Sequence, residues 1–154
     1  MRRLTHGALI AALYCALTLL LQPFSFGAVQ FRLSEALTML PLLTDAAVPG
    51  LFIGCLLSNL LGASTIFDIV FGSLATLLAA VLTRKLRRKP LLAAACPVLC
   101  NGLITGTVVS GITHTPILLS MLWIAVSEAV ICYLLGLPLI RLLKRTNLFT
   151  SEGR

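Results

Sequence analysis

The chain alternates between long runs of apolar residues and short clusters of polar residues, glycine and proline. Apolar runs of this length, separated by polar clusters, are typical of a membrane protein with several spans. The pattern predicts an all-α fold, an integral membrane bundle of six transmembrane helices that forms a single domain over residues 1–154. The spans are expected at about 5–21, 34–43, 48–61, 67–82, 90–112 and 116–143.

The second and third predicted spans are shorter than the others. At 1.5 Å per residue, both fall short of a hydrocarbon core about 30 Å thick. We therefore expect these two helices to be surrounded by protein or tilted toward a cavity. Ser34 is expected to cap the second span, and Pro41 is expected to bend it.

The composition supports a membrane location. Apolar residues make up 58% of the chain and charged residues 11%, against roughly 45–50% and about 25% in soluble domains. The cysteines lie within the apolar runs and are interpreted as small buried apolar residues, so no metal site and no cofactor are expected. They are Cys15, Cys55, Cys96, Cys100 and Cys132.

Basic residues are distributed unevenly around the predicted spans. Arg2 and Arg3 precede the first span, five basic residues lie between 84 and 89, and four lie between 141 and 154. With six spans, all three groups fall on one side of the membrane, which the positive-inside rule makes cytoplasmic. The sequence thus predicts a multi-pass protein of the cell membrane with both termini in the cytoplasm. Nucleic-acid binding is not expected, because no aromatic residues are interleaved with the basic ones.

Three acidic residues, Glu35, Asp68 and Glu128, lie in or at the edge of apolar stretches. A carboxylate in hydrocarbon costs roughly 2.5–3.5 kcal/mol on insertion scales, so such a residue usually lines a cavity or binds something. In the predicted topology, Asn59 and Asn101 also lie away from the cytoplasmic ends of their helices. Together these five residues predict an acidic, amide-rich pocket that opens to the outside.

Each of these residues could instead be satisfied separately. Glu35 and Asp68 could be helix-start carboxylates that the helix dipole favours, and the two asparagines could join helices through hydrogen bonds. Glu128 lies about midway along its span, where no capping role explains it.

A basic and polar segment is expected at the rim of the pocket. Arg32 could pair there with Glu35 or Asp68, and its neighbours Gln30 and Phe31 could face a ligand.

Alanines recur at every fourth residue of the first span, at Ala8, Ala12 and Ala16. This spacing places them on one helix face, where small side chains let another helix backbone approach closely. The face could contact a partner protein or pack within the bundle. Two glycine pairs with the same spacing are interpreted as internal contacts: Gly50 with Gly54, and Gly102 with Gly106.

Several catalytic motifs are missing from the sequence. It has no G-x-x-x-x-G-K-[ST], so this chain cannot hold ATP in a P-loop of its own. It also has neither H-E-x-x-H nor G-x-S-x-G, and His6 and His114 lie far apart. These observations disfavour an enzyme.

Three stretches of the sequence carry a family resemblance: Gln30–Thr38 followed by Leu40-Pro41, Pro49–Cys55 with Asn59, and Asp68–Thr76. They resemble the QueT family of queuosine-precursor transporters, and the resemblance covers most of the chain. It is looser around Asn101 and Ser127-Glu128, and Asp45 stands where the family has a less charged turn.

Proteins of this family look like S components, the substrate-binding subunits of energy-coupling factor (ECF) transporters. The resemblance implies a six-helix membrane bundle that holds its ligand under the outer loops. It also implies docking on a transmembrane T component and two cytoplasmic ATPase subunits. The face formed by Ala8, Ala12 and Ala16 would then contact the T component.

The implied substrate is a queuosine precursor: a 7-deazaguanine base, with or without an aminomethyl group, or queuine. A guanine-like edge presents a ring N–H and an exocyclic amine, two donors that one carboxylate can accept together. An aminomethyl cation would require a second carboxylate. Glu35 and Glu128 are the expected pair, without an assignment of which does which.

Asn59 and Asn101 are expected to read the carbonyl and ring nitrogens of the base, and Phe31 or Trp123 to stack on its face. Three alternatives stay open. The protein could be a stand-alone secondary transporter or cation channel whose carboxylates relay protons or ions. It could be an assembly factor whose polar residues only join helices, or an S component for another vitamin.

Overall fold

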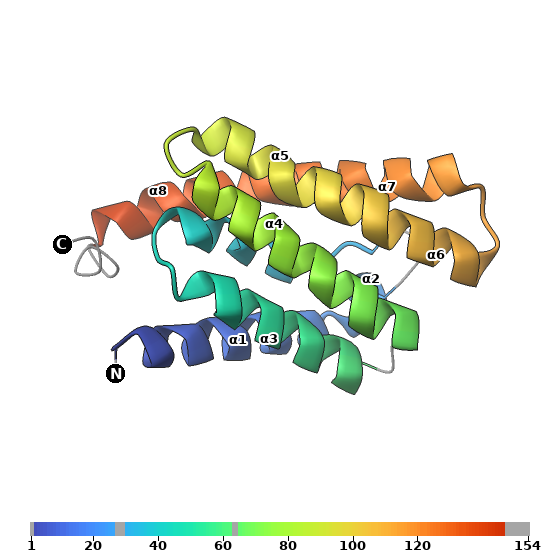
Figure 1. Ribbon diagram of the computed structural model, residues 1–154, viewed down its shortest axis with the longest axis horizontal. Helices are drawn as coiled ribbons and strands as arrows, with labels where there is room; N and C mark the ends of the chain where they lie inside the picture. Colours follow the sequence, from blue (N-terminus) through green and yellow to red (C-terminus); the bar gives the residue numbers. More distant parts are fainter. Residues whose placement is uncertain (1, 27–29, 63–64, 147–154) are drawn as a thin grey trace.

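The structure is a computed structural model that describes residues 2–26, 30–62 and 65–146. All regular secondary structure in these ranges is helical, and the helices run side by side along the long axis of the molecule (Figure 1). Three helices are long and apolar enough to cross a membrane: Arg3–Leu20, Pro90–Thr113 and Ile117–Arg145. The predicted all-α membrane bundle is thereby confirmed.

The first half of the chain forms four separate helices. They are α1 (Arg2–Leu20), the short α2 (Gln22–Ser25), the 3₁₀ helix η1 (Leu33–Leu42) and α3 (Ala47–Leu61).

The second half forms three rods, each of them an unbroken run of helical segments that contains a π-helical stretch. The first rod is η2 (Asp68–Gly72) with α4 (Ser73–Lys85). The second is α5 (Pro90–Cys100) with η3 (Asn101–Thr105) and α6 (Gly106–Thr113). The third is α7 (Ile117–Ala129) with η4 (Val130–Gly136) and α8 (Leu137–Arg145).

Each predicted span coincides with one of these helices or rods, and the boundaries differ by a few residues. Pro90 lies in the first turn of α5, where its missing N–H has no intrahelical partner to lose. That all six elements cross a membrane stays a prediction, because η1 and α3 are apolar but short.

The short helix η1 lies in the centre of the bundle, and its residues 34–42 are all buried. The second span is therefore surrounded by protein, as its length predicted. The prediction that Ser34 caps this helix is wrong, because η1 begins without a side-chain cap. Ser34 Oγ instead lies 2.7 Å from Thr18 Oγ1 of α1, within hydrogen-bond distance.

The other end of η1 is tied to α4. Pro41 lies inside η1, one residue before its last residue. Its carbonyl oxygen accepts a 2.9 Å hydrogen bond from Arg84 Nη1, close to the end of α4. Hydrogen-bond contacts with α1 and α4 thus lie near opposite ends of the central helix, and the bend at Pro41 stays a prediction.

Glycines let neighbouring helices touch backbone to backbone. A Cβ atom built at Gly50 of α3 would lie 2.6 Å from Gly7 O of α1, closer than real Cβ contacts. A Cβ atom at Gly106 would lie 2.7 Å from Met121 Cα of α7. The glycine pairs at 50 and 54 and at 102 and 106 thus serve internal contacts, as predicted.

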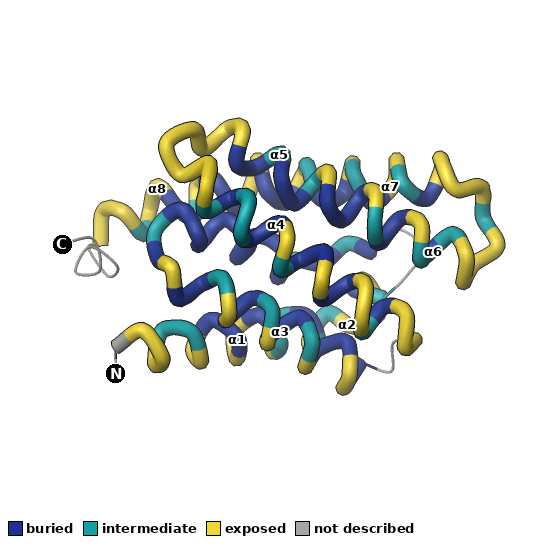
Figure 2. The backbone as a smooth tube through the Cα atoms, viewed as in Figure 1, coloured by how far each residue is buried: buried dark blue, intermediate teal, exposed yellow. Residues whose placement is uncertain are grey.

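The bundle has an apolar surface around a partly polar interior, the reverse of a soluble protein. Leu118 is 77% exposed, and Leu91 and Leu134 are also largely exposed. In contrast, Glu35 and Asn59 are buried. Figure 2 shows the buried positions on the inner sides of the helices and many exposed ones on their outer sides. Exposed apolar area of this extent is suited to contact with lipid.

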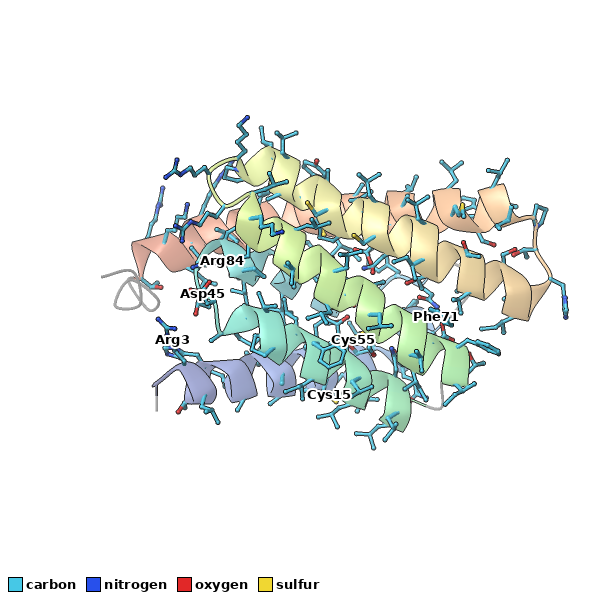
Figure 3. All side chains as sticks on the ribbon, viewed as in Figure 1. Arg3, Cys15, Asp45, Cys55, Phe71 and Arg84 are labelled. Carbon is cyan, nitrogen blue, oxygen red and sulfur yellow. The ribbon has the colours of Figure 1, made fainter. Side chains whose placement is uncertain are left out.

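The start of α1 and the end of α8 lie at the same end of the bundle (Figure 1). Figure 3 places Arg3, Asp45 and Arg84 at this end as well, and Asp45 forms an ion pair with Arg84. The exposed basic residues that follow Arg84 and those in the last turn of α8 join them there. The positive charge is thus concentrated at one end of the molecule, as the sequence predicted.

Candidate functional site

A small buried cavity lies where η1, the first rod and the middles of the two longer rods meet. Its volume is about 10 Å³, which is room for about one water molecule. The lining is mostly polar and comes from six separate parts of the chain. It consists of Gln30, Arg32, Glu35, Gly72, Thr76, Asn101, Thr105, Ile124 and Glu128.

Glu128 reaches the cavity from the end of α7. Its Oε1 accepts a 2.8 Å hydrogen bond from Asn101 Nδ2, at the first residue of η3. Its Oε2 lies 3.8 Å from the thiol of Cys132, one turn further along the rod. Both oxygens of this buried carboxylate therefore already face donors from the protein itself.

One side-chain amide atom of Asn101 has no hydrogen-bond partner among the described residues. An ionised carboxylate only accepts hydrogen bonds, so the amide nitrogen of Asn101 faces Glu128 and its Oδ1 faces away. Oδ1 is buried and has no hydrogen-bond partner among the described residues. This side chain consequently offers the cavity a free acceptor at Oδ1.

Glu35 reaches the cavity from the start of η1. Its Oε1 accepts a hydrogen bond from the hydroxyl of Tyr14 on α1. Its Oε2 is buried and has no partner within the described part of the chain. Leaving a buried acceptor unsatisfied costs about 1–3 kcal/mol, and more for a charged group. This oxygen is thus well suited to accept an N–H group from a ligand.

Arg32 brings the positive charge to the cavity. Its Nε donates a 3.0 Å hydrogen bond to Ser25 O, and its guanidinium lies over the ring of Phe26, 5.0 Å from the centroid. Its Nη2 is buried without a hydrogen-bond partner in the ranges that the structure describes. The guanidinium is therefore held by its own segment of chain and presents a free donor.

Gln30 lines the cavity beside Arg32 with an unusual backbone. Its φ of 45° lies in the left-handed region, which costs free energy for a residue other than glycine. Such conformations cluster at functional sites, where the surrounding structure holds them in place.

Asn59 and Asp68 form a separate polar group next to the cavity. Asn59 Nδ2 donates to Asp68 O at 3.1 Å, and Asp68 Oδ2 accepts a 3.1 Å hydrogen bond from Thr65 Oγ1. Neither residue lines the cavity. Gly72 lies between them and the cavity, since a Cβ atom there would lie 3.2 Å from Asn59 Nδ2. The structure thus places these two residues behind the cavity wall.

The two aromatic residues expected to stack on a base lie outside the cavity lining. Phe31 is half-buried, and Trp123 is 50% exposed on the lipid-facing side of α7. Ile124, the next residue along, lines the cavity instead. An aliphatic side chain can also cover the face of a ring, without the specific geometry of aromatic stacking.

Sequence reasoning missed five residues that contribute to the site. Four of them line the cavity, namely Gly72, Thr76, Thr105 and Ile124, and the fifth, Tyr14, donates a hydrogen bond to Glu35 from α1. Thr76 is the last residue of the Asp68–Thr76 stretch quoted above, so the family resemblance contained a signal for it. Tyr14 lies between Ala12 and Ala16, but on the inner side of α1, where a helical-wheel argument would have found it.

The π-helical stretches lie beside the cavity. Gly72 ends η2, Asn101 begins η3, and Glu128 precedes η4 by two residues. A π stretch changes the direction in which the following residues point, and such stretches are frequent at functional sites.

The alanine face of α1 points outward. Ala8, Ala12 and Ala16 are all exposed, whereas Gly7 and Ala11 contact α3. An apolar groove of about 400 Å³ runs beside this face, between α1 and α3. Its lining includes Ala8, Ala12, Pro49 and Ile53. The alternative of internal packing within the described bundle thus applies to Gly7 and Ala11 and not to the three alanines.

The chemistry that the cavity supports is binding. It offers two acceptors, Glu35 Oε2 and Asn101 Oδ1, and one cationic donor, Arg32 Nη2. Within the described residues, no three His, Cys, Asp or Glu side chains are grouped so that they could hold a metal ion.

Comparison with known proteins matches residues 4–145 to the QueT transporter family. The Queuosine precursor transporter QueT of Lactococcus lactis subsp. cremoris (strain MG1363) is 38% identical over 72 residues. The match covers 46% of this chain and 42% of that relative, so it spans less than half of the relative's length. No solved structure matches the chain.

Proposed function

The chain belongs to the QueT transporter family, and on this basis we propose that it is the substrate-binding S component of an ECF importer for a queuosine precursor. The observation that carries the proposal is the group of unpaired polar atoms around the buried cavity. Glu35 Oε2, Asn101 Oδ1 and Arg32 Nη2 converge there inside a bundle whose surface is apolar. Each unpaired buried polar atom lowers stability, so three that face one cavity favour a polar ligand there. Four further unpaired atoms of the described residues, on Ser25, Asn59, Asp68 and Ser73, lie outside the lining.

The cavity suits the chemistry of a 7-deazaguanine base. Such a base carries a ring N–H and an exocyclic amine side by side, and Glu35 offers a free carboxylate oxygen to these donors. With Glu35 and Glu128 ionised, the lining holds two negative charges against the one positive charge of Arg32. An excess of negative charge favours a base that bears an aminomethyl cation.

Ligand binding must widen the cavity, since the described volume of about 10 Å³ is far smaller than a bicyclic base. Gln30 and Arg32 are the lining residues on the loop side, and Arg32 is held by Ser25 and Phe26 of the same segment.

ATP hydrolysis is assigned to separate subunits in this proposal. The printed sequence contains no P-loop motif, so the energy source would be two cytoplasmic ATPases coupled through a T component. The exposed face of Ala8, Ala12 and Ala16, with the apolar groove beside it, is the proposed surface for the T component. Small residues on a lipid-facing helix allow another helix to approach closely.

The proposed orientation is multi-pass in the cell membrane with both termini in the cytoplasm. The basic residues around Arg84 and in the last turn of α8 lie at the end of the bundle where α1 starts and α8 ends. The positive-inside rule makes this end cytoplasmic. The cavity segment of Gln30 and Arg32 precedes η1 at the opposite end, which would face the outside.

Two measurements test the proposal. Calorimetry of the detergent-solubilised protein with 7-deazaguanine bases should show saturable binding, and mass spectrometry should find such a base in protein purified from cells supplied with it. Uptake of the labelled base should then require the T component and the ATPases. Uptake without these subunits would favour a stand-alone secondary transporter, and binding of another vitamin in place of the base would reassign the substrate.

A further inference from the structure

The free atoms of the cavity differ in hydrogen-bonding character. Glu35 Oε2 and Asn101 Oδ1 are acceptors, and Arg32 Nη2 is a donor. Asn101 Nδ2 uses one of its two N–H groups in the 2.8 Å bond to Glu128, and the group is a neutral amide. Seven buried side-chain atoms of the described residues have no hydrogen-bond partner. Among those that belong to the cavity lining, Arg32 Nη2 is the donor, and the other two are acceptors.

A guanine-type edge has the complementary order of groups. It presents one acceptor, the 6-oxo group, followed by two donors, the ring N–H and the 2-amino group. The two free acceptors of the cavity match the two donors of this edge, and the free donor of Arg32 matches its acceptor.

Resting on the function proposed above, we infer that Arg32 is the specificity-determining residue that reads the 6-oxo group of the base. Its side chain is 4% exposed. The bond from Nε to Ser25 O and the ring of Phe26 fix the plane of the guanidinium. A planar, fully ionised donor in a fixed position is a strong partner for a carbonyl oxygen.

This assignment predicts rejection of bases with a 6-amino group. A 6-amino analogue would turn an N–H donor toward the guanidinium, so a buried charged donor would be left without an acceptor. Its ring N1 also carries no hydrogen, so it presents one donor fewer to the acceptors of the cavity, and an Arg32 variant separates this effect from that of the guanidinium. Sites that bind a substrate group through buried hydrogen bonds reject analogues that lack it far more strongly than apolar pockets do.

The wild-type protein supplies the first test, with no variant required. Binding of 7-deazaguanine and of its 6-amino analogue is measured by calorimetry in detergent. The analogue should bind more weakly by on the order of a hundredfold. Equal affinity for both bases would overturn the role of Arg32. If neither base binds the wild-type protein, the proposed function fails, and this inference fails with it.

The second test removes the donor. Arg32→Met should weaken 7-deazaguanine binding by on the order of tenfold to a hundredfold and leave the 6-amino analogue within about threefold. The ratio of the two affinities should consequently fall. Arg84→Met is the matched control: Arg84 is also partly buried and hydrogen-bonded, but it lies at the opposite end with Asp45. It should leave the ratio unchanged.

A structural role of Arg32 gives a different result. If Arg32 only stabilises its segment, Arg32→Met weakens both bases equally and the ratio stays at the wild-type value, which would overturn the inference while the proposed function stands. If Arg32→Met does not purify as a folded protein, Arg32→Lys provides the measurement. Lys keeps the charge but loses the planar guanidinium, so the ratio should still fall, and an unchanged ratio would overturn the inference.

Discussion

Tyr14 of α1 donates a hydrogen bond from its hydroxyl to Glu35 of η1. Both side chains are fully or almost fully buried. The same helix exposes Ala12 and Ala16 on its outer side. The candidate docking face and the hydrogen bond to the candidate binding site thus lie on different sides of the same helix, α1.

The pair between Tyr14 and Glu35 leads to a first prediction, on stability. Tyr14→Phe removes the donor and leaves Glu35 with no side-chain partner among those described, so the free energy of unfolding should fall by about 1–3 kcal/mol. Thermal unfolding in detergent measures the change. Tyr133→Phe is the matched control, because Tyr133 donates to Leu91 O from an exposed position. An equal loss of unfolding free energy in both variants would show that the buried Tyr14 bond contributes no more to stability than the exposed Tyr133 bond.

The second prediction concerns the two carboxylates of the cavity. Glu35→Gln and Glu128→Gln keep the side-chain shape but replace an acceptor by a donor, so the affinity for a 7-deazaguanine base should fall on the order of tenfold to a few hundredfold. Glu35→Gln should have the larger effect, since Glu35 Oε2 is free for the ligand. Glu128 Oε1 is already bound to Asn101, and a glutamine oxygen can keep that bond.

Calorimetry on the purified carboxylate variants gives these affinities. Asp45→Asn is the control, because Asp45 pairs with Arg84 at the other end of the bundle, and it should leave binding unchanged. Unchanged affinity in both glutamate variants would refute the pocket described here.

The sequence was sufficient to predict the helices, because uninterrupted apolar runs between turn residues leave few other arrangements. It was also sufficient to bring Glu35, Asn101 and Glu128 to one cavity. Each of these is a costly polar residue, and the charge pattern fixes the depth at which each lies.

The rotation of each helix about its own axis was harder to predict. Trp123 and Ile124 are neighbours in sequence, and a rotation of about 100° per residue turns one toward lipid and the other toward the cavity. The π-helical stretches η2 and η3 add local changes of rotation that no sequence pattern signalled. For this reason Asn59 and Asp68 do not line the cavity, although they lie at a suitable depth along their helices.

A third prediction tests the contact between α1 and α3. Gly50→Ala would place a Cβ atom 2.6 Å from Gly7 O, so the two backbones must separate. Overpacking of this kind typically costs 1–3 kcal/mol, and the apparent melting temperature in detergent should fall. Gly111→Ala is the control, since a Cβ atom there meets no described atom within 4 Å, and it should be neutral or slightly stabilising. Equal melting temperatures for the two variants would contradict the close contact.

The last prediction separates the S-component proposal from a stand-alone transporter. Ala12→Trp places an indole on the exposed face of α1, beside the groove that Ala8 and Ala12 line. A T-component helix could then no longer approach closely, so ATP-driven uptake should be lost. Ligand binding by the isolated protein should stay nearly intact, because Tyr14 lies on the inner side of α1 and Glu35, its partner, lies on η1 in the centre of the bundle. A channel or secondary transporter gives no reason for this separation of uptake from binding.

Two paired measurements on the same preparations check this last prediction: co-purification with the T component and ATPases, and binding of the base in detergent. Leu99→Trp is the control, because Leu99 is 60% exposed on the apolar surface of α5, away from α1. Its indole would meet lipid, so both association and binding should persist. If Ala12→Trp instead loses ligand binding while it still associates with the other subunits, the alanine face supports the pocket from within. The docking surface would then have to lie on a different helix.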